Sequence, residues 1–301
     1  MWASDAYFRA QLIPPAGGLT APQIVVVEDA LITVFLIPVL LRGLGEMRRL
    51  GSRGWLAMAI IGIGPQALAT VLFTASFSYR HFAETFVLQQ TQPLIAIMLA
   101  WIILGERRRR WFWAAAAVAI VGVYMVVFAQ DLTAPFAQFQ SGRLEAGILA
   151  LGAAALWASG TVLGRWVLGS ASFPTTTALR FTLALPVLIA IVLVQNGAVG
   201  FTHYRASYAL PFLGIALIPG LAALLLYYRA LASTPATLAT IAEMAYPVAA
   251  TFVASAPPPW GFNQPLYPAQ FAGTLLLLLV LATLNWTKER RDLAPVQALA
   301  T

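Results

Sequence analysis

Long apolar stretches follow one another along the whole chain and are separated by short polar segments. A membrane-spanning helix needs about 20 mainly apolar residues. Nine stretches have about that length: 24–41, 54–79, 84–104, 111–129, 145–168, 175–195, 208–231, 235–255 and 266–286. A shorter one, residues 1–13, precedes them. The pattern predicts an all-α membrane protein with ten transmembrane helices, the first of them incomplete.

The second half of the chain repeats landmarks of the first. Residues 2–5 (Trp-Ala-Ser-Asp) return as residues 157–160 (Trp-Ala-Ser-Gly). Prolines recur at offsets of 152 to 154 residues: Pro22 and Pro174, Pro65 and Pro219, Pro93 and Pro247. We therefore expect two repeats, residues 1–135 and residues 145–290, with five helices each. Because five is an odd number, the second repeat is expected to lie inverted in the membrane.

The first repeat starts more abruptly than the second. An apolar run of Gly, Ala and Leu precedes Trp157, whereas Trp2 stands next to residue 1. We expect that the chain begins inside its first helix. The alternative is a short half-helix that enters the membrane and stops.

Composition agrees with a membrane protein and excludes several other classes. Hydrophobic residues make up 60% of the chain and charged residues 10%, against about a quarter charged in soluble domains. The absence of cysteine excludes disulfides, zinc–thiolate sites and thiol nucleophiles. No nucleotide-binding loop, nucleophile motif or metal-binding pattern occurs, so we expect neither a cofactor nor an enzyme. A lipid-modifying membrane enzyme would need clustered His, Asp or Lys, and the chain has two histidines.

The net charge of +7 does not indicate nucleic-acid binding, because the cations fall in short clusters between apolar stretches. Arginine and lysine are enriched on the cytoplasmic side of membrane proteins. With the connection that holds Arg42, Arg48, Arg49 and Arg53 inside, most other cations also fall inside. This orientation predicts a multi-pass inner-membrane protein. Both ends face the cytoplasm if the first helix is complete.

These landmarks together resemble a known transporter group. The resemblance depends on the repeated Trp-Ala-Ser, on Gln92-Pro93-Leu94 followed by Leu-Gly-Glu-Arg at residues 104–107, and on Gly122 in the next helix. Both halves resemble EamA domains, the repeat of the ten-helix branch of the drug/metabolite transporter superfamily. In the second half, residues 256–260 replace the Leu-Gly-Glu-Arg turn. That turn is therefore expected to be structural and not part of the transport site.

The resemblance implies a basket of ten helices around a central cavity that opens alternately to either side. Such proteins often export small metabolites, so we expect a small-molecule substrate, amino-acid-like or related, with the bilayer as the other partner. The alternatives are a facilitator, a multidrug-type cation exporter, a channel or a scaffold. Monomer and homodimer both stay open.

Three carboxylates in the first two helices are candidates, because ionisable groups inside a span are costly and usually functional. Asp5 follows the first Trp-Ala-Ser and could accept a proton or bind an ammonium group. Its other interpretation is a hydrated residue near a frayed helix end. Glu28 and Asp29 are candidates for proton coupling, and neighbours in a helix point about 100° apart. Their other interpretation is hydration at the interface, or pairing with Arg9.

A second group of candidates lies beside prolines at matching positions of the two repeats. Glu243 precedes Pro247 by four residues, as Gln89 precedes Pro93. Proline leaves the carbonyl four residues earlier unbonded and bends the helix. Proline-interrupted helices in matching positions are a pointer to a binding site. Further substrate-binding candidates here are Gln92 and Tyr246. Hydrogen bonding between helices is the alternative role.

The remaining candidates are one cation and two aromatic residues. Arg180 lies in the seventh span, at the position that matches Glu28. It could extend to the cytoplasmic interface, or it could bind a substrate carboxylate. Trp2 and Trp157 occupy equivalent places in the repeats and could form walls of the cavity, where an aromatic face suits a cationic or aromatic substrate.

Overall fold

The computed structural model of the protein describes residues 4–104, 110–133, 142–223, 226, 245–258 and 260–286. Within these ranges the chain is helical, without strands. The first half contains α1 (Asp5–Leu12), α2 (Ala21–Arg42), α3 (Leu44–Arg49), α4 (Gly51–Ile61), η2 (Gly62–Leu68), α5 (Ala69–Ser76), η3 (Phe77–Tyr79), α6 (Phe82–Gln89), α7 (Gln92–Leu104) and α8 (Arg110–Val127). The second half contains α9 (Arg143–Val167), α10 (Phe173–Asn196), η5 (Ala198–Thr202), η6 (Ala206–Tyr208), α11 (Ala209–Ile215), η7 (Ala216–Ala222), α14 (Ala245–Ser255) and α15 (Pro268–Trp286).

Four helical segments in the described ranges are long and apolar enough to cross a membrane: Ala21–Arg42, Gly51–Tyr79, Arg143–Gly164 and Phe173–Asn196. Three shorter apolar helices accompany them: Phe112–Val127, Ala206–Ala222 and Pro268–Thr283. The all-α membrane fold is therefore confirmed. The predicted number of ten spans stays a prediction.

Two helices are π-helical around the repeated proline. Pro65 lies in η2 and Pro219 lies in η7, and both segments have seven residues. A proline cannot donate the usual backbone hydrogen bond, and a wider turn accommodates the missing bond. Such π-segments are frequent at functional sites. The same local distortion thus occurs at matching positions of the two halves.

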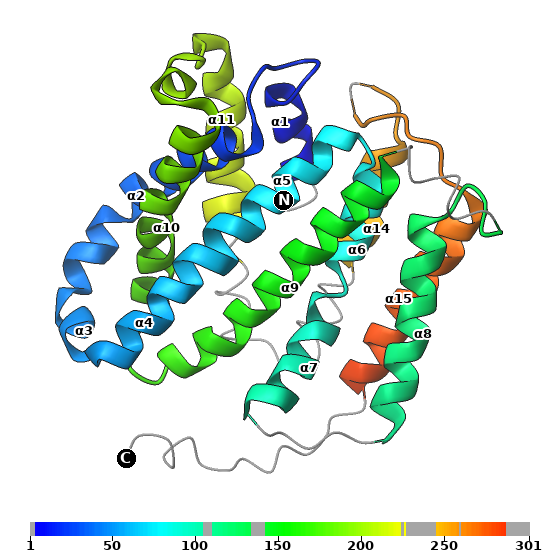
Figure 1. Ribbon diagram of the computed structural model, residues 1–301, viewed down its shortest axis with the longest axis horizontal. Helices are drawn as coiled ribbons and strands as arrows, with labels where there is room; N and C mark the ends of the chain where they lie inside the picture. Colours follow the sequence, from blue (N-terminus) through cyan, green and yellow to red (C-terminus); the bar gives the residue numbers. More distant parts are fainter. Residues whose placement is uncertain are drawn as a thin grey trace.

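The long helix α9 crosses the middle of the molecule (Figure 1). It packs against α4, η2, α5, α6 and α7. On one side of it, α2 packs along α10; on the other, α8 packs along α15 (Figure 1). The helix α1 packs against α11, and α6 packs against α14.

Several close helix contacts depend on glycine. A Cβ on Gly160 would lie 2.6 Å from the Cβ of Pro65, and one on Gly214 would lie 2.5 Å from the ring of Phe8. Between α8 and α15, a Cβ on Gly273 would lie 2.7 Å from the carbonyl oxygen of Gly122. Small residues allow membrane helices to approach this closely. Gly122 is therefore a packing residue.

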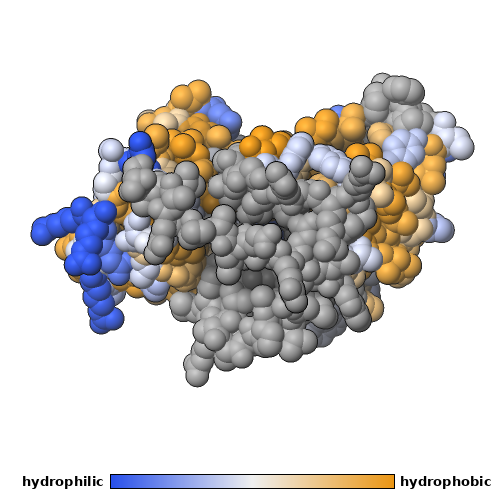
Figure 2. Space-filling model, turned by 90° about the horizontal axis from the view of Figure 1, so that it is seen from below, coloured by the Kyte–Doolittle hydropathy of each residue, from blue (hydrophilic) through white to orange (hydrophobic). Residues whose placement is uncertain are grey.

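Polar residues collect at one end of the molecule. Arg42, Arg48, Arg49 and Arg53 are exposed, in or beside α3. Figure 2 shows hydrophilic residues gathered at the end that carries α3, whereas the visible flanks are mainly hydrophobic. The apolar flanks suit a lipid environment, and the basic end suits a membrane surface.

Candidate functional site

The first element of the site is a buried arginine that holds two acidic side chains. Arg9 donates from Nε to Asp5 Oδ2 at 2.7 Å and from Nη1 to the Thr74 hydroxyl at 2.8 Å. Its Nη2 lies 2.9 Å from Glu28 Oε1 and 2.8 Å from Oε2. Asp5 and Arg9 are one turn apart on α1, Glu28 comes from α2 and Thr74 from α5. We call these four residues the Arg9 cluster.

The charged side chains of the Arg9 cluster are buried, so each depends on its partners. Arg9 is 3% exposed, Glu28 6% and Asp5 8%. A charge removed from water is tolerated when it is paired and hydrogen-bonded, and removing one partner leaves the other charge uncompensated. One guanidinium here faces two carboxylates, and Asp5 Oδ1 has no hydrogen-bond donor within the described ranges. The cluster therefore has a spare acceptor at its α1 end.

Asp29 contacts a different partner from its neighbour Glu28. Asp29 is fully buried, and its Oδ1 accepts a hydrogen bond of 3.0 Å from the amide of Gln66 in η2. Its Oδ2 has no hydrogen-bond partner among the residues that the structure describes. The positive charge of Arg180 on α10 acts on the same carboxyl group. The two adjacent acids thus have different hydrogen-bond partners, as the rotation of 100° per residue allows.

An aromatic wall lies beside the Arg9 cluster. Trp157 on α9 meets Phe73 edge to face at a centroid distance of 5.2 Å. Phe73 meets Phe86 at 6.4 Å, and Phe86 meets Tyr246 on α14 at 5.8 Å, again edge to face. Phe73 precedes Thr74 of the Arg9 cluster in α5. Phe73, Phe86, Trp157 and Tyr246 are called the aromatic wall below.

The wall ends at a break between two helices. The Tyr246 hydroxyl donates to Gln89 Oε1 at 3.1 Å. Gln89 is the last residue of α6, residues 90–91 form a turn, and α7 starts at Gln92. The predicted effect of Pro93 is confirmed here, since the apolar stretch 84–104 is divided into two helices. A free helix end beside an aromatic wall supplies polar groups inside an apolar region.

A second buried ion pair ties three helices together near the start of α9. Arg143 and Glu84 form a salt bridge, and both side chains are buried. The guanidinium of Arg143 lies 4.9 Å from the ring centre of Tyr267, next to α15. His81 Nδ1 lies 3.7 Å from Glu84 Oε1. This pair holds the ends of α6, α9 and α15 together at a distance from the Arg9 cluster along the chain.

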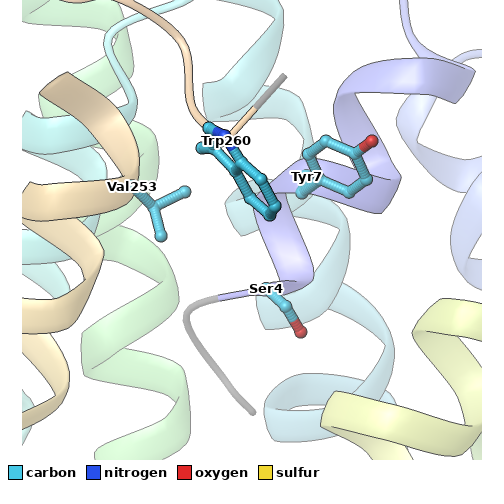
Figure 3. Close-up of a pocket in the computed structure, with 4 residues that line it drawn as sticks. All are labelled: Ser4, Tyr7, Val253 and Trp260. Atoms are coloured by element: carbon cyan, nitrogen blue, oxygen red, sulfur yellow. The ribbon is translucent and has the colours of Figure 1, made fainter. Parts of the chain in front are cut away.

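The structure has an open pocket of about 440 Å³. Its lining residues are Ser4 and Tyr7 from the start of α1, Val253 from α14, and Trp260 from the loop that follows α14. Figure 3 shows the indole of Trp260 between Val253 and Tyr7, with Ser4 below it. Asp5, the next residue after Ser4, belongs to the Arg9 cluster. Ser4 and Asp5 thus place the pocket lining and the Arg9 cluster on consecutive residues of the chain.

The structure brings together five of the residues that sequence analysis selected. Asp5 and Glu28 share Arg9, and Gln89, Trp157 and Tyr246 belong to the wall and its end. Asp5 is buried, so hydration at a frayed end is wrong for it; for Glu28, pairing with Arg9 is observed. Gln92 is half-buried at the start of α7. Trp2 and Glu243 lie outside the described residues.

The structure places Arg180 inside its span, and it adds three residues that sequence analysis did not select as site residues. Arg180 is half-buried and lies 5.8 Å from the ring of its neighbour Phe181, and extension to the cytoplasmic interface stays a prediction. Sequence analysis missed Thr74 and Gln66, and it treated Arg9 only as a partner. Gln66 carried a signal, because it follows the repeated Pro65 while Gly220 follows Pro219.

The apolar helices and the buried polar site define a multi-pass membrane protein with groups suited to binding a solute. The profile of the EamA-like transporter family matches residues 16–128 and 145–286, and the chain belongs to that family. The resemblance of both halves to EamA domains is thereby confirmed.

Curated proteins and solved structures are similar to this chain. The riboflavin transporter ImpX of Fusobacterium nucleatum subsp. nucleatum is 29% identical over 218 residues, which cover 72% of this chain and 70% of that protein. The uncharacterized transporter YwfM of Bacillus subtilis is 25% identical over 204 residues, 67% of this chain and 64% of that protein. A structure described as "Crystal structure of protein" aligns with a TM-score of 0.59 and 17% identity, over 98% of this chain and 95% of that one. This last likeness concerns the fold alone.

Proposed function

We propose that the protein is a secondary transporter that moves a small organic solute across the inner membrane by alternating access. Family membership supports transport as the activity. The observation that carries the proposal is the convergence of the Arg9 cluster and the aromatic wall from α1, α2, α5, α6, α9 and α14. Helices from both halves of the chain thus contribute to one buried polar site, as expected for transporters built from repeats.

The proposed architecture is two inverted five-helix repeats, residues 1–135 and 145–290. Contacts between equivalent helices support it. The helices α2 and α8 each pack against the helix at the matching place in the other half, α10 and α15. The opening helix of each repeat packs on the other repeat, since α1 contacts α11 and α9 contacts η2. Such reciprocal contacts are the pattern that a pseudo-twofold axis generates.

We further propose a planar heteroaromatic compound as the solute. Aromatic side chains from four helices form the wall, and rings pair favourably edge to face or offset-stacked at centroid distances of about 4.5–7 Å. The relative ImpX is named as a riboflavin transporter, and riboflavin combines a planar ring system with a hydroxylated chain. Such a compound needs apolar walls with a few fixed polar groups. An amino-acid-like solute, expected from the resemblance, stays the alternative.

Proton coupling, if it operates, is assigned to Asp29 and not to Glu28. The carboxylate of Glu28 is bound to Arg9, whereas Asp29 Oδ2 has no hydrogen-bond partner within the described ranges. Loss or gain of a proton at Asp29 would change its bond to Gln66 in the π-helical segment η2. Movement of η2 would then accompany the proton.

The test is riboflavin flux in proteoliposomes, measured by flavin fluorescence in both directions, with and without a pH gradient. We expect saturable riboflavin flux. Other planar heteroaromatic compounds should inhibit it, and amino acids should not. The resemblance implies export. Comparing flux into and out of the proteoliposomes distinguishes export from import. Linear, non-saturable flux would favour a channel. With coupling, the pH gradient accelerates flux in the wild type and not in Asp29→Asn; equal rates in the wild type remove coupling.

A further inference from the structure

We infer that the pocket lined by Ser4, Tyr7, Val253 and Trp260 is a separate docking station for a planar heteroaromatic solute, located at the mouth of the path to the Arg9 cluster. This inference deepens the proposed function and depends on it for the identity of the solute. The volume of about 440 Å³ falls in the range of small-molecule sites, about 300–1,000 Å³. Of the lining residues that the structure describes, Tyr7 and Trp260 are aromatic.

Trp260 is an exposed side chain on a loop whose backbone is hydrogen-bonded to α14. Its side chain is 79% exposed. The loop that carries it is nevertheless fixed, because the N–H groups of Phe262 and Gln264 donate to the carbonyls of Val253 and Ala254 at 3.1 and 2.9 Å. The ring of Phe262 stacks on Phe82 at 4.0 Å with an interplanar angle of 12°. A large apolar side chain held out by a rigid loop contributes little to folding, so it suggests a binding role.

The tightness of this loop supports the same point. A Cβ on Gly261 would lie 2.1 Å from the carbonyl oxygen of Val253 and 2.6 Å from that of Ala256. The backbone after Trp260 therefore lies directly against the end of α14. The backbone that carries the indole is thus fixed, and within the described part of the chain Trp260 makes no ring–ring contact. Rigid presentation lowers the entropy cost of binding.

Two aromatic side chains, Tyr7 and Trp260, line the pocket together. Figure 3 shows the rings of Trp260 and Tyr7 side by side, with Ser4 below them in the view. Tyr7 is 41% exposed. A planar ring can stack on the indole, as bases stack on aromatic side chains in nucleic-acid-binding proteins.

The pocket shares helices α1 and α14 with the buried site. Along α1, Ser4 is followed by Asp5, whose Oδ1 lacks a donor within the described ranges. Along α14, Val253 and Tyr246 are seven residues apart, so they lie on the same helix face about 10 Å from each other. Both walls of the pocket therefore lead to the Arg9 cluster and the aromatic wall. A solute released from the pocket meets Tyr246 and Asp5 next.

The absence of native cysteine allows a direct test. Val253→Cys places a single thiol in the pocket, His203→Cys places one in the exposed connection after α10, and Ser52→Cys places one at the basic end. A membrane-impermeant maleimide applied to intact cells should label the first two thiols and leave the third unlabelled. Labelling at Ser52→Cys instead of the other two would place the pocket on the cytoplasmic side and overturn its position at the outer mouth.

The probe is riboflavin added during labelling of purified protein. Occupancy slows the reaction by a factor of one plus the ratio of ligand concentration to Kd, so about tenfold protection at ten times Kd is expected for Val253→Cys. His203→Cys should show no protection. Adding Trp260→Ala to Val253→Cys should raise the half-protecting concentration about tenfold or more, because stacking is lost. Trp55→Ala, which removes a half-exposed indole elsewhere, should leave it unchanged.

Flux and protection separate the two proposals. Riboflavin flux without protection of Val253→Cys overturns the docking station and keeps the transport proposal. Protection without flux keeps the station and overturns riboflavin as the transported solute. Protection that is identical with and without Trp260→Ala means that Trp260 serves as an interfacial anchor only, which also overturns the station as described. Absence of both flux and protection removes both proposals for this compound.

Discussion

In the first half of the chain, the Trp-Ala-Ser motif ends in Asp5, which binds the buried Arg9. In the second half the same motif ends in Gly160, and the missing side chain allows α9 to contact Pro65. A similar difference follows the repeated proline. Gln66 donates to Asp29, whereas a Cβ on its counterpart Gly220 would lie 2.8 Å from Ile32 Cδ1. One half carries charge and hydrogen bonds where the other carries close packing.

This difference shows how a duplicated scaffold can hold a single asymmetric site. A polar pair placed in both halves would put twice the buried charge at the centre, and each buried charge needs a partner. Glycine at the second copy of each position removes that need and brings the helices closer. The predictions that follow test whether the first half depends on charge and the second on packing, in order of decreasing effect.

The largest effect is expected for Arg9→Gln. Asp5 and Glu28 lose their shared partner in a buried place, and breaking a buried ion pair costs about 3–5 kcal/mol. Thermal unfolding in detergent should show a large drop in Tm, together with loss of flux. The triple variant Arg9→Gln, Asp5→Asn, Glu28→Gln removes all three charges and should recover most of the stability without recovering flux. Equal Tm values for the single and triple variants would contradict a role of charge pairing.

The next effect belongs to the second half, at Gly160→Ala. Its methyl group would lie 2.6 Å from the Cβ of Pro65. Overpacking of this kind costs about 1–3 kcal/mol. Gly164→Ala is the matched control on the same helix, because no atom lies within 4 Å of its added Cβ. Since alanine is the better helix former, the control should keep or slightly raise Tm. A Gly160→Ala protein as stable as the control would show that packing does not limit this position.

A smaller effect is expected at Tyr246→Phe, where the two halves meet. The substitution removes the hydroxyl that donates to Gln89 and keeps the ring against Phe86. A typical hydrogen bond contributes about 0.5–1.5 kcal/mol. We expect a modest fall in Tm and a raised KM for riboflavin flux with little change in maximal rate. Tyr246→Ala, which also removes the ring, should raise KM much further. If the two variants gave the same KM, the aromatic wall would have no part in binding.

The smallest effect is at Glu46 in α3, which joins the surface of the first half to the start of α10. The backbone N–H of Ser172 donates to Glu46 Oε2 at 2.7 Å, and this bond, with the Ser172 and Thr175 hydroxyls, lowers the pKa of Glu46. A lowered folded-state pKa stabilises the fold above the ordinary glutamate pKa of about 4.3 and loses that contribution as pH falls through the folded value. Wild-type Tm should therefore fall more on acidification than that of Glu46→Gln. Parallel pH curves would contradict this.

Much of the scaffold could be predicted from sequence because it depends on local patterns. Apolar length placed the helices within a few residues: the stretch 175–195 corresponds to Phe173–Asn196, and 24–41 to Ala21–Arg42. Pro93 predicted the break between α6 and α7 because proline acts on its own helix. Pro65 and Pro219 marked the repeat, although a π-helical segment was not predicted from them.

The centre of the site could be predicted only in part, because partners come from different helices. The costly carboxylates Asp5 and Glu28 drew attention by themselves. Thr74 is an ordinary residue of an apolar helix, and only the packing of α5 beside α1 and α2 gives it a role. Arg180 was placed by its depth in a span, but its surroundings depend on how α10 lies against α2. Contacts between distant segments need the fold.

The close contact between Gly122 and Gly273 has a mechanical consequence. A backbone carbonyl lies where a side chain would otherwise start, so α8 and α15 cannot slide past each other by a residue without a clash. The last described helices of the two halves therefore form a rigid frame at one edge of the molecule (Figure 1). Rearrangements that expose the centre to either side must take place relative to this frame. A crosslink between α8 and α15 would accordingly leave turnover intact, whereas one between α1 and α14 would stop it.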